Sequence, residues 1–146
     1  MNKIISISKS HTEKLGQDFS KKIKPRDVIC LYGDLGSGKT TFVKGLARAL
    51  NVRSRVISPT FIIVRTHLVA GSENIDTLYH VDLYRLDNLA EIKRVGLKDL
   101  LNDDRGVVII EWPEKGKKIL PKKRWEIFFR QLDKNSREVI IKRKNG

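Results

Sequence analysis

The chain carries a glycine-rich run whose residue types and spacing are those of a phosphate-binding loop. Residues 33–40 read GDLGSGKT and satisfy the pattern G-x-x-x-x-G-K-[ST]. The glycines let successive backbone N–H groups point into one concavity, and a helix that begins there adds partial positive charge where phosphates sit. Lys39 can then reach the β- and γ-phosphates, Thr40 can offer its hydroxyl to Mg²⁺, and Thr41 is placed to touch the α-phosphate. The residues of this segment expected to bind a nucleotide are Gly33, Asp34, Leu35, Gly36, Ser37, Gly38, Lys39, Thr40 and Thr41.

Two acidic residues compete for the role of holding the metal that accompanies a bound nucleotide. Glu111 follows the apolar run 107–110, at the strand end where open α/β sheets place their ligand crevice, so it is the better magnesium candidate. Asp82 closes another predicted strand, whose period of two places it on one polar face with His80 and Tyr84. The structural alternatives are a salt bridge between Asp82 and Arg85, and a helix N-cap or a surface ion pair for Glu111.

Two further positions are candidates for contact with the nucleotide. Residues 58–61 read SPTF and lie between the predicted loop helix and the next strand, where nucleotide-sensing loops commonly sit. Thr60 in this segment could reach a γ-phosphate or its metal, and an ordinary Ser-Pro turn is the alternative. Trp112 directly follows Glu111, and on composition alone it is more typical of core or sheet-edge packing than of a stacking surface. Cys30, on the strand before the loop, is predicted to be a small buried hydrophobe.

The spacing of apolar residues predicts the strands and helices that would position these groups. The continuously apolar run at 107–110 indicates a strand buried on both faces, and therefore a central parallel sheet. Ser10 and Glu13 have the spacing of a capping box at the start of a helix, in which apolar residues recur every four positions until Pro25 ends it. Further strands are expected at 3–8, 28–32, 61–64, 77–83, 124–132 and 138–143, the last two forming a hairpin, and further helices at 39–50 and 89–101, the second one split at Gly96.

Length and composition indicate one globular domain spanning residues 1–146, since the chain has 146 residues of which 40% are apolar. A single cysteine excludes an intramolecular disulfide and a zinc site of several thiolates, which fits a cytoplasmic protein. We expect no signal peptide and no membrane span. The net charge is +13, and residues 112–146 carry twelve Lys and Arg against four acids, a net of +8. Such a basic region attracts phosphate backbones or an acidic protein surface.

Four blocks taken together resemble the TsaE family, formerly called YjeE. They are GDLGSGKTTF at 33–42, SPTF at 58–61, HVDLYRL at 80–86 and IEWPE at 110–114, and they occur in that family's order. The resemblance implies an α/β fold of the P-loop NTPase type, with parallel central strands, an antiparallel C-terminal hairpin and helices on both faces. It also implies a magnesium-dependent bacterial ATPase required for threonylcarbamoyladenosine, a modification of the adenosine next to the anticodon in tRNA.

The family's pattern also implies partners and residue roles for this chain. TsaE proteins act on the TsaB–TsaD pair and are not the transferase, so we expect ATP hydrolysis to be weak without these partners. The cofactors implied are ATP and Mg²⁺, with Lys39 on the phosphates, Thr40 and Glu111 on the metal, and Asp82 orienting water or lying in the metal shell. The basic C-terminal region is expected to contact tRNA or an acidic partner surface. The residues important for turnover are Lys39, Thr41, Asp82, Glu111 and Trp112, and Thr60 falls in the switch-like segment.

Three other functions use some of the same features. A small-molecule or nucleoside kinase also builds on a phosphate-binding loop, but the sequence shows no clear lid segment. A GTPase is disfavoured because there is no N-K-x-D stretch for guanine, and the D-x-x-G at 103–106 precedes a predicted strand instead of ending one. A non-enzymatic nucleic-acid-binding module would explain the charge but would leave Lys39, Thr40 and Glu111 without a role.

Overall fold

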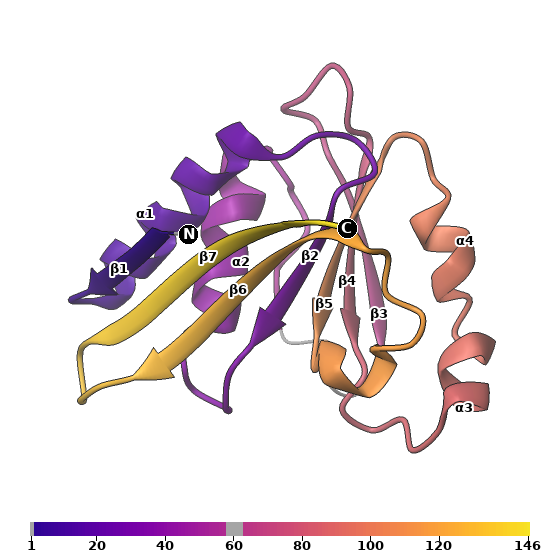
Figure 1. Ribbon diagram of the computed structural model, residues 1–146. Helices are drawn as coiled ribbons and strands as arrows, with labels where there is room; N and C mark the ends of the chain where they lie inside the picture. The colour runs from indigo at the N-terminus through magenta and orange to yellow at the C-terminus, as the bar shows by residue number, and fades with distance from the viewer. Residues whose placement is uncertain (1, 58–62) are drawn as a thin grey trace.

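A computed structural model describes residues 2–57 and 63–146 of the chain. Its centre is a seven-stranded sheet in the order β1-β7-β6-β2-β5-β4-β3 (Figure 1). The strands are β1 (Asn2–Ser6), β2 (Val28–Tyr32), β3 (Val64–Leu68), β4 (Thr77–Asp82), β5 (Gly106–Glu111), β6 (Lys123–Gln131) and β7 (Arg137–Asn145). The helices are α1 (Lys9–Phe19), α2 (Lys39–Ala49), α3 (Leu89–Arg94) and α4 (Leu97–Leu101), with short 3-10 helices at Ser20–Lys22 and Pro113–Gly116.

The central strands of the sheet run parallel, as the apolar run of β5 predicts. Strand β2 pairs in parallel with both β5 and β6, and β4 pairs in parallel with β5. All six residues of β5 are buried, because helices cover both faces of the sheet at this point. Strands β6 and β7 form the expected antiparallel C-terminal hairpin, and β1 extends it by pairing antiparallel with β7. The predicted fold class is therefore confirmed.

Each face of the sheet packs against its own pair of helices (Figure 1). Helices α1 and α2 cover one face and bury a core that includes Ile29, Leu31 and Ile109. Helices α3 and α4 pack on the other face, over β4 and β5, against a core that includes Cys30 and Ile110. The predicted burial of Cys30 is confirmed. Of the described helices, none is long and apolar enough to cross a membrane.

Backbone contact between α1 and α2 fixes the place of α2, whose first turn carries Lys39. A Cβ added at Gly45 of α2 would lie 1.9 Å from the carbonyl oxygen of Glu13. A Cβ added at Gly16 of α1 would lie 2.1 Å from the carbonyl oxygen of Phe42. No real side chain tolerates such distances, so glycine at both positions lets the two helices touch backbone to backbone.

The structure corrects two predicted element boundaries. The N-cap of α1 is Ser8, whose Oγ accepts from the backbone N–H of His11 at 3.0 Å, so the predicted capping box at Ser10 and Glu13 is wrong. Residues 8 and 11 have the same spacing as residues 10 and 13, and Nδ1 of His11 also accepts from the backbone N–H of Ile7 at 3.2 Å. Of the predicted strand at 61–64, residues 61–62 lie outside the described residues, residue 63 is not in a strand, and Val64 is the first residue of β3. Strand β3 pairs antiparallel with β4 at the sheet edge, and its mixed polar sequence hides it from pattern analysis.

Other boundaries agree with the sequence. Gly96 separates α3 from α4 in a left-handed conformation with φ of 80°. Asn51 adopts the left-handed conformation, with φ of 55°, directly after α2 and its C-cap Leu50. At the carboxyl ends of the parallel strands, Asp82 of β4 and Glu111 of β5 are direct neighbours in the ladder. The sheet thus brings both candidate acids to the edge at which the β2–α2 loop lies.

Candidate functional site

The loop between β2 and α2 presents an open helix N-terminus. Gly38 is the N-cap of α2 in a left-handed conformation with φ of 109°, and no side chain caps the helix. The first N–H groups of a helix have no partner within it, so here they can bind an anion. A Cβ added at Gly38 would also lie 2.7 Å from Nη1 of Arg137 on β7. The backbone conformation favours glycine here, and the short distance shows that the Arg137 side chain lies directly against the loop.

Lys39 lies at the centre of the site and is only 6% exposed. Its Nζ donates to the carbonyl oxygen of Gly33 at 2.5 Å and lies 4.0 Å from Oε1 of Glu111. The same ammonium group lies 4.7 Å from the ring centroid of Trp112, as a cation–π contact. A lysine held by one carbonyl, one carboxylate and one ring can exchange these partners for phosphate oxygens without becoming exposed.

Trp112 is half-buried and shapes one wall of this site. Its backbone has φ of 58° and ψ of 47°, a conformation that is uncommon for a bulky residue and is found preferentially at functional positions. The ring lies 4.8 Å from that of Tyr84, measured between centroids, and Nζ of Lys115 lies 5.3 Å from the Tyr84 ring. Trp112 therefore packs against the core, as the composition predicts, and also forms an aromatic wall beside Lys39.

Burial of the two acids decides one of the alternatives that the sequence leaves open, the surface ion pair of Glu111. Both are 3% exposed, so the surface ion pair considered for Glu111 is wrong. Oε2 of Glu111 lies 2.6 Å from Nε2 of His80. Oδ1 of Asp82 accepts from the backbone N–H of Tyr84 at 2.8 Å, which orders the chain as it leaves β4. Buried carboxylates need strong compensation, and at this site a lysine and a histidine supply it for Glu111.

These groups surround one cavity of about 350 Å³, called here the loop cavity. Four cationic side chains line it against two carboxylates, which gives a positive field suited to a polyphosphate. The residues that line the loop cavity are Lys9, Leu35, Gly36, Gly38, Lys39, Thr40, Thr41, Asp82, Glu111, Trp112, Gln131, Lys134 and Arg137.

Most of the predicted site residues thus meet in the loop cavity. Gly33, Asp34 and Ser37 do not line it and instead border a second cavity of about 660 Å³ on the other side of the loop, called here the hairpin groove. Thr60 lies outside the described residues. Leu35 lines both spaces and is 80% exposed at the loop tip.

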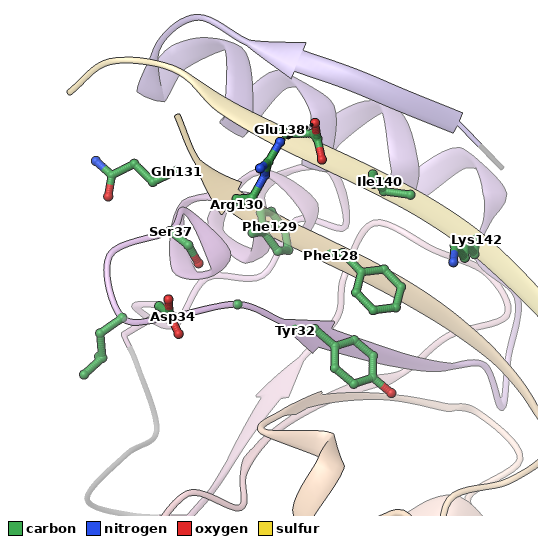
Figure 2. Close-up of a pocket in the computed structure, with 12 residues that line it drawn as sticks. Tyr32, Asp34, Ser37, Phe128, Phe129, Arg130, Gln131, Glu138, Ile140 and Lys142 are labelled. Atoms are coloured by element: carbon green, nitrogen blue, oxygen red, sulfur yellow. Dashed lines mark hydrogen bonds and ion pairs between the residues drawn. The ribbon is translucent and has the colours of Figure 1, made fainter. Parts of the chain in front are cut away.

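The hairpin groove lies between the loop and the open face of β6 and β7, as Figure 2 shows. Tyr32 and Phe128 stack in it with centroids 4.6 Å apart and ring planes 10° apart. Nζ of Lys142 lies 5.1 Å from the centroid of the Phe128 ring. Arg130 and Glu138 form an ion pair at 3.1 Å on the groove wall, and the other charged side chains that line the groove are Asp34 and Lys142. The groove is thus more aromatic and less cationic than the loop cavity.

Sequence reasoning missed three cationic residues of the loop cavity, Lys9, Lys134 and Arg137. They come from α1, from the hairpin turn and from β7, far from the loop in the chain. Arg137 is 5% exposed, and its Nε has no hydrogen-bond partner among the described residues. An unpaired buried guanidinium nitrogen is costly, which indicates that the arginine awaits an anionic partner. No motif marks this position, because the contact depends on how the hairpin folds back over the loop.

The few protein oxygens at this site suit a metal ion that takes most of its ligands from water and phosphate. Among residues 2–57 and 63–146, no group of three or more His, Cys, Asp and Glu side chains is arranged to hold a metal ion. Mg²⁺ keeps several waters and is bound through one or two protein oxygens together with substrate phosphates. Glu111 and the Thr40 hydroxyl could supply such oxygens beside the loop, whereas a zinc or iron site would need more protein ligands.

Comparisons with known proteins all match this chain to members of one family. The family model described as "Threonylcarbamoyl adenosine biosynthesis protein TsaE" matches residues 6–139. The chain is 33% identical to the tRNA threonylcarbamoyladenosine biosynthesis protein TsaE of Bacillus subtilis, over 93% of this chain and 82% of that protein. It is 37% identical to the protein of that name from Aquifex aeolicus, over 99% of this chain and 98% of the other. The crystal structure of YdiB from Bacillus subtilis superposes with a TM-score of 0.79 at 29% identity, covering 99% of this chain and 86% of that chain. The chain therefore belongs to the TsaE family.

Proposed function

We propose that this chain is a magnesium-dependent ATP-binding and ATP-hydrolysing protein that acts in the threonylcarbamoyladenosine modification of tRNA. The observation that carries the proposal is the loop cavity, in which an uncapped helix N-terminus, a buried lysine and a buried carboxylate face one space. The curated relatives are named for threonylcarbamoyladenosine biosynthesis in tRNA, which supports the pathway. We assign the modification to the adenosine next to the anticodon.

Different residues of the loop cavity bind different parts of the nucleotide and its metal ion. Backbone N–H groups from Gly36 to Thr41 take the phosphates, because the helix dipole and the unpaired donors converge there. Lys39 leaves Gly33 and pairs with the β- and γ-phosphates. Thr40 and Glu111 would hold Mg²⁺, which would supply positive charge beside the phosphate oxygens. Buried positions for Lys39 and Glu111 keep their interactions strong, since water screens them little.

Two other side chains act at the reacting end of the nucleotide. Asp82 is the neighbour of Glu111 in the β4–β5 ladder and lines the same cavity, so it is placed to orient the attacking water or to bind a metal-bound water. Trp112 lies against Lys39 and limits the entry of bulk water from that side. We expect turnover to be slow when the chain is alone, and to depend on the TsaB–TsaD pair.

The open face of the hairpin supports a contact with tRNA. No helix among the described residues covers β6 and β7 on the face that bears the hairpin groove (Figure 1). On this face the exposed lysines are Lys142 and Lys144, both on β7. Lysines at such a surface bind phosphate backbones without sequence preference. Arg124 does not belong to this surface, because it is 7% exposed and donates to Glu126. Charge reversal at Lys142 and Lys144 should therefore weaken tRNA binding, and unchanged binding would remove this contact from the proposal.

Reconstituted modification tests the proposed function. Purified TsaB and TsaD, with tRNA and the threonylcarbamoyl donor, should give repeated rounds of modification only when this chain and ATP are added. Lys39→Ala should abolish the effect, because it removes the ammonium group that the phosphates need, and an exposed-surface change such as Lys44→Ala should not. Equal modification with and without the chain would contradict the proposal. Transfer of phosphate from ATP to a small metabolite would instead favour the rival kinase function.

A further inference from the structure

His80 is buried beneath the loop cavity and contacts Glu111. The side chain is 0% exposed and does not line the cavity, so a bound nucleotide would not touch it. Its Nε2 lies 2.6 Å from Oε2 of Glu111, while Oε1 of the same carboxylate lies 4.0 Å from Nζ of Lys39. One carboxylate oxygen of Glu111 therefore contacts His80 in the interior, and the other lies on the side of Lys39 and the loop.

We propose that His80 is a positioning residue for the magnesium carboxylate, and this inference rests on the proposed function. The Nε2–H group of His80 donates to Oε2 of Glu111 and holds the carboxylate so that Oε1 faces the loop and the metal. Its Nδ1 is buried and has no hydrogen-bond partner among the described residues. The proton therefore belongs on Nε2, where an acceptor is present, and Nδ1 stays unprotonated.

A fixed carboxylate matters because of the demands of Mg²⁺. The ion requires near-ideal octahedral geometry, and a glutamate has three side-chain torsions that must all be set before it can bind well. A hydrogen bond from behind sets these torsions in advance. Removal of such an outer partner typically costs about 10- to 100-fold in metal affinity.

His80 and Asp82 lie two positions apart on β4, so their side chains project to the same face of the strand. In the ladder, Asp82 pairs with Glu111, and His80 pairs with Ile109, one step deeper. Asp82 therefore lies beside the carboxylate at the cavity, and His80 supports it from the interior. This division explains why a polar residue occupies a fully buried strand position, which a purely structural strand would fill with an apolar residue.

Substitution at His80 separates positioning from simple filling of space. The amide nitrogen of a glutamine lies as many bonds from Cα as Nε2 of histidine, so His80→Gln can keep the donor. In His80→Asn the amide reaches only to the level of Nδ1, and in His80→Ala no donor remains. His67→Gln is the matched control, because His67 is 2% exposed on β3 and contacts Ser54 away from the cavity.

The measured quantity is the Mg²⁺ concentration at half-maximal binding of a fluorescent ATP analogue, with binding in excess EDTA as the second reading. We expect the half-maximal Mg²⁺ concentration to rise about 10- to 100-fold in His80→Asn and His80→Ala. The affinity for the ATP analogue in excess EDTA should stay unchanged in both variants. His80→Gln and His67→Gln should stay within about threefold of the wild type. Equal values for wild type and His80→Ala, or equal shifts for Gln and Asn, would overturn the inference. If the wild-type protein binds no ATP analogue, the proposed function fails instead.

Imidazole ¹⁵N NMR of the wild-type protein without nucleotide provides a reading that needs no folded variant. We expect the His80 signal to show a proton on Nε2 that is shared with a carboxylate acceptor. A proton on Nδ1, with Nε2 unprotonated, would overturn the inference, since Glu111 would then have no donor from this side chain.

Discussion

Replacement of Arg137 by alanine should weaken nucleotide binding strongly while leaving the fold intact. Arg137 is 5% exposed, its Nε has no partner among the described residues, and a Cβ on Gly38 would lie 2.7 Å from its Nη1. The guanidinium therefore lies against the loop between β2 and α2, and its Nε is available to a ligand. A hydrogen bond to a charged group contributes about 1.5–3 kcal/mol, and burial keeps water from screening it. One such contact corresponds to about 10- to 150-fold in the dissociation constant.

Isothermal titration of ATP with Mg²⁺ into the wild type and Arg137→Ala measures this change directly. The matched control is Arg130→Ala on the same hairpin, because the Arg130 side chain is 70% exposed and forms a surface ion pair with Glu138. Surface pairs contribute about 0–1 kcal/mol, so this control should bind ATP almost as the wild type does. Arg137→Lys keeps the charge but loses the planar fork, and we expect intermediate affinity.

The apo stability of Arg137→Ala gives an independent check. Removal of a buried arginine that lacks a full set of partners should leave the free energy of unfolding nearly unchanged or raise it. Affinity equal to that of the wild type would refute the reasoning. A large loss of stability without nucleotide would also refute it, because the arginine would then have a structural role.

Three further predictions concern the helix contact, the buried thiol and the aromatic wall. Gly45→Ala should lower the free energy of unfolding in urea by about 3 kcal/mol, since the new Cβ would lie 1.9 Å from the Glu13 carbonyl oxygen, and an unchanged urea midpoint would contradict the backbone contact. Burial raises the pKa of the Cys30 thiol from 9.0 to about 12, so the thiol ionises at lower pH in the unfolded chain. Stability should therefore fall as pH rises from 9 towards 12, and a Cys30→Ala variant should lose that part of the decline, so equal declines would count against it. Trp112 fluorescence should change when ATP draws Lys39 away from the ring, and a change of equal size in Trp112→Phe would show that another group reports binding.

The central sheet and the loop were predictable because their signals are local. A glycine-rich pattern between a strand and a helix specifies its own geometry, and a fully apolar run such as that of β5 indicates burial on both faces. The same locality placed Asp82 and Glu111 at strand ends, and the β4–β5 register then made them neighbours. Local patterns succeed where one segment determines both the backbone and the direction of its side chains.

The remaining features depend on contacts between distant segments. Arg137 reaches the loop only because β7 folds back beside β6, and no spacing in the sequence encodes that approach. The N-cap of α1 is Ser8 and not the predicted Ser10, because both serines precede a residue at the spacing of a cap and the sequence alone does not distinguish them. His80 was placed on the correct polar face, yet its contact with Glu111 required the side-chain geometry.

The measurement that tests the proposed function most directly is ATP hydrolysis by the pure protein, alone and with its cognate TsaB–TsaD pair, with GTP as the control nucleotide. We predict slow hydrolysis alone, clear stimulation by the pair, and loss of both in Glu111→Ala, because we propose that this carboxylate, 4.0 Å from Nζ of Lys39, binds Mg²⁺. No stimulation by the pair, hydrolysis that persists in Glu111→Ala, or a preference for GTP would contradict the proposal.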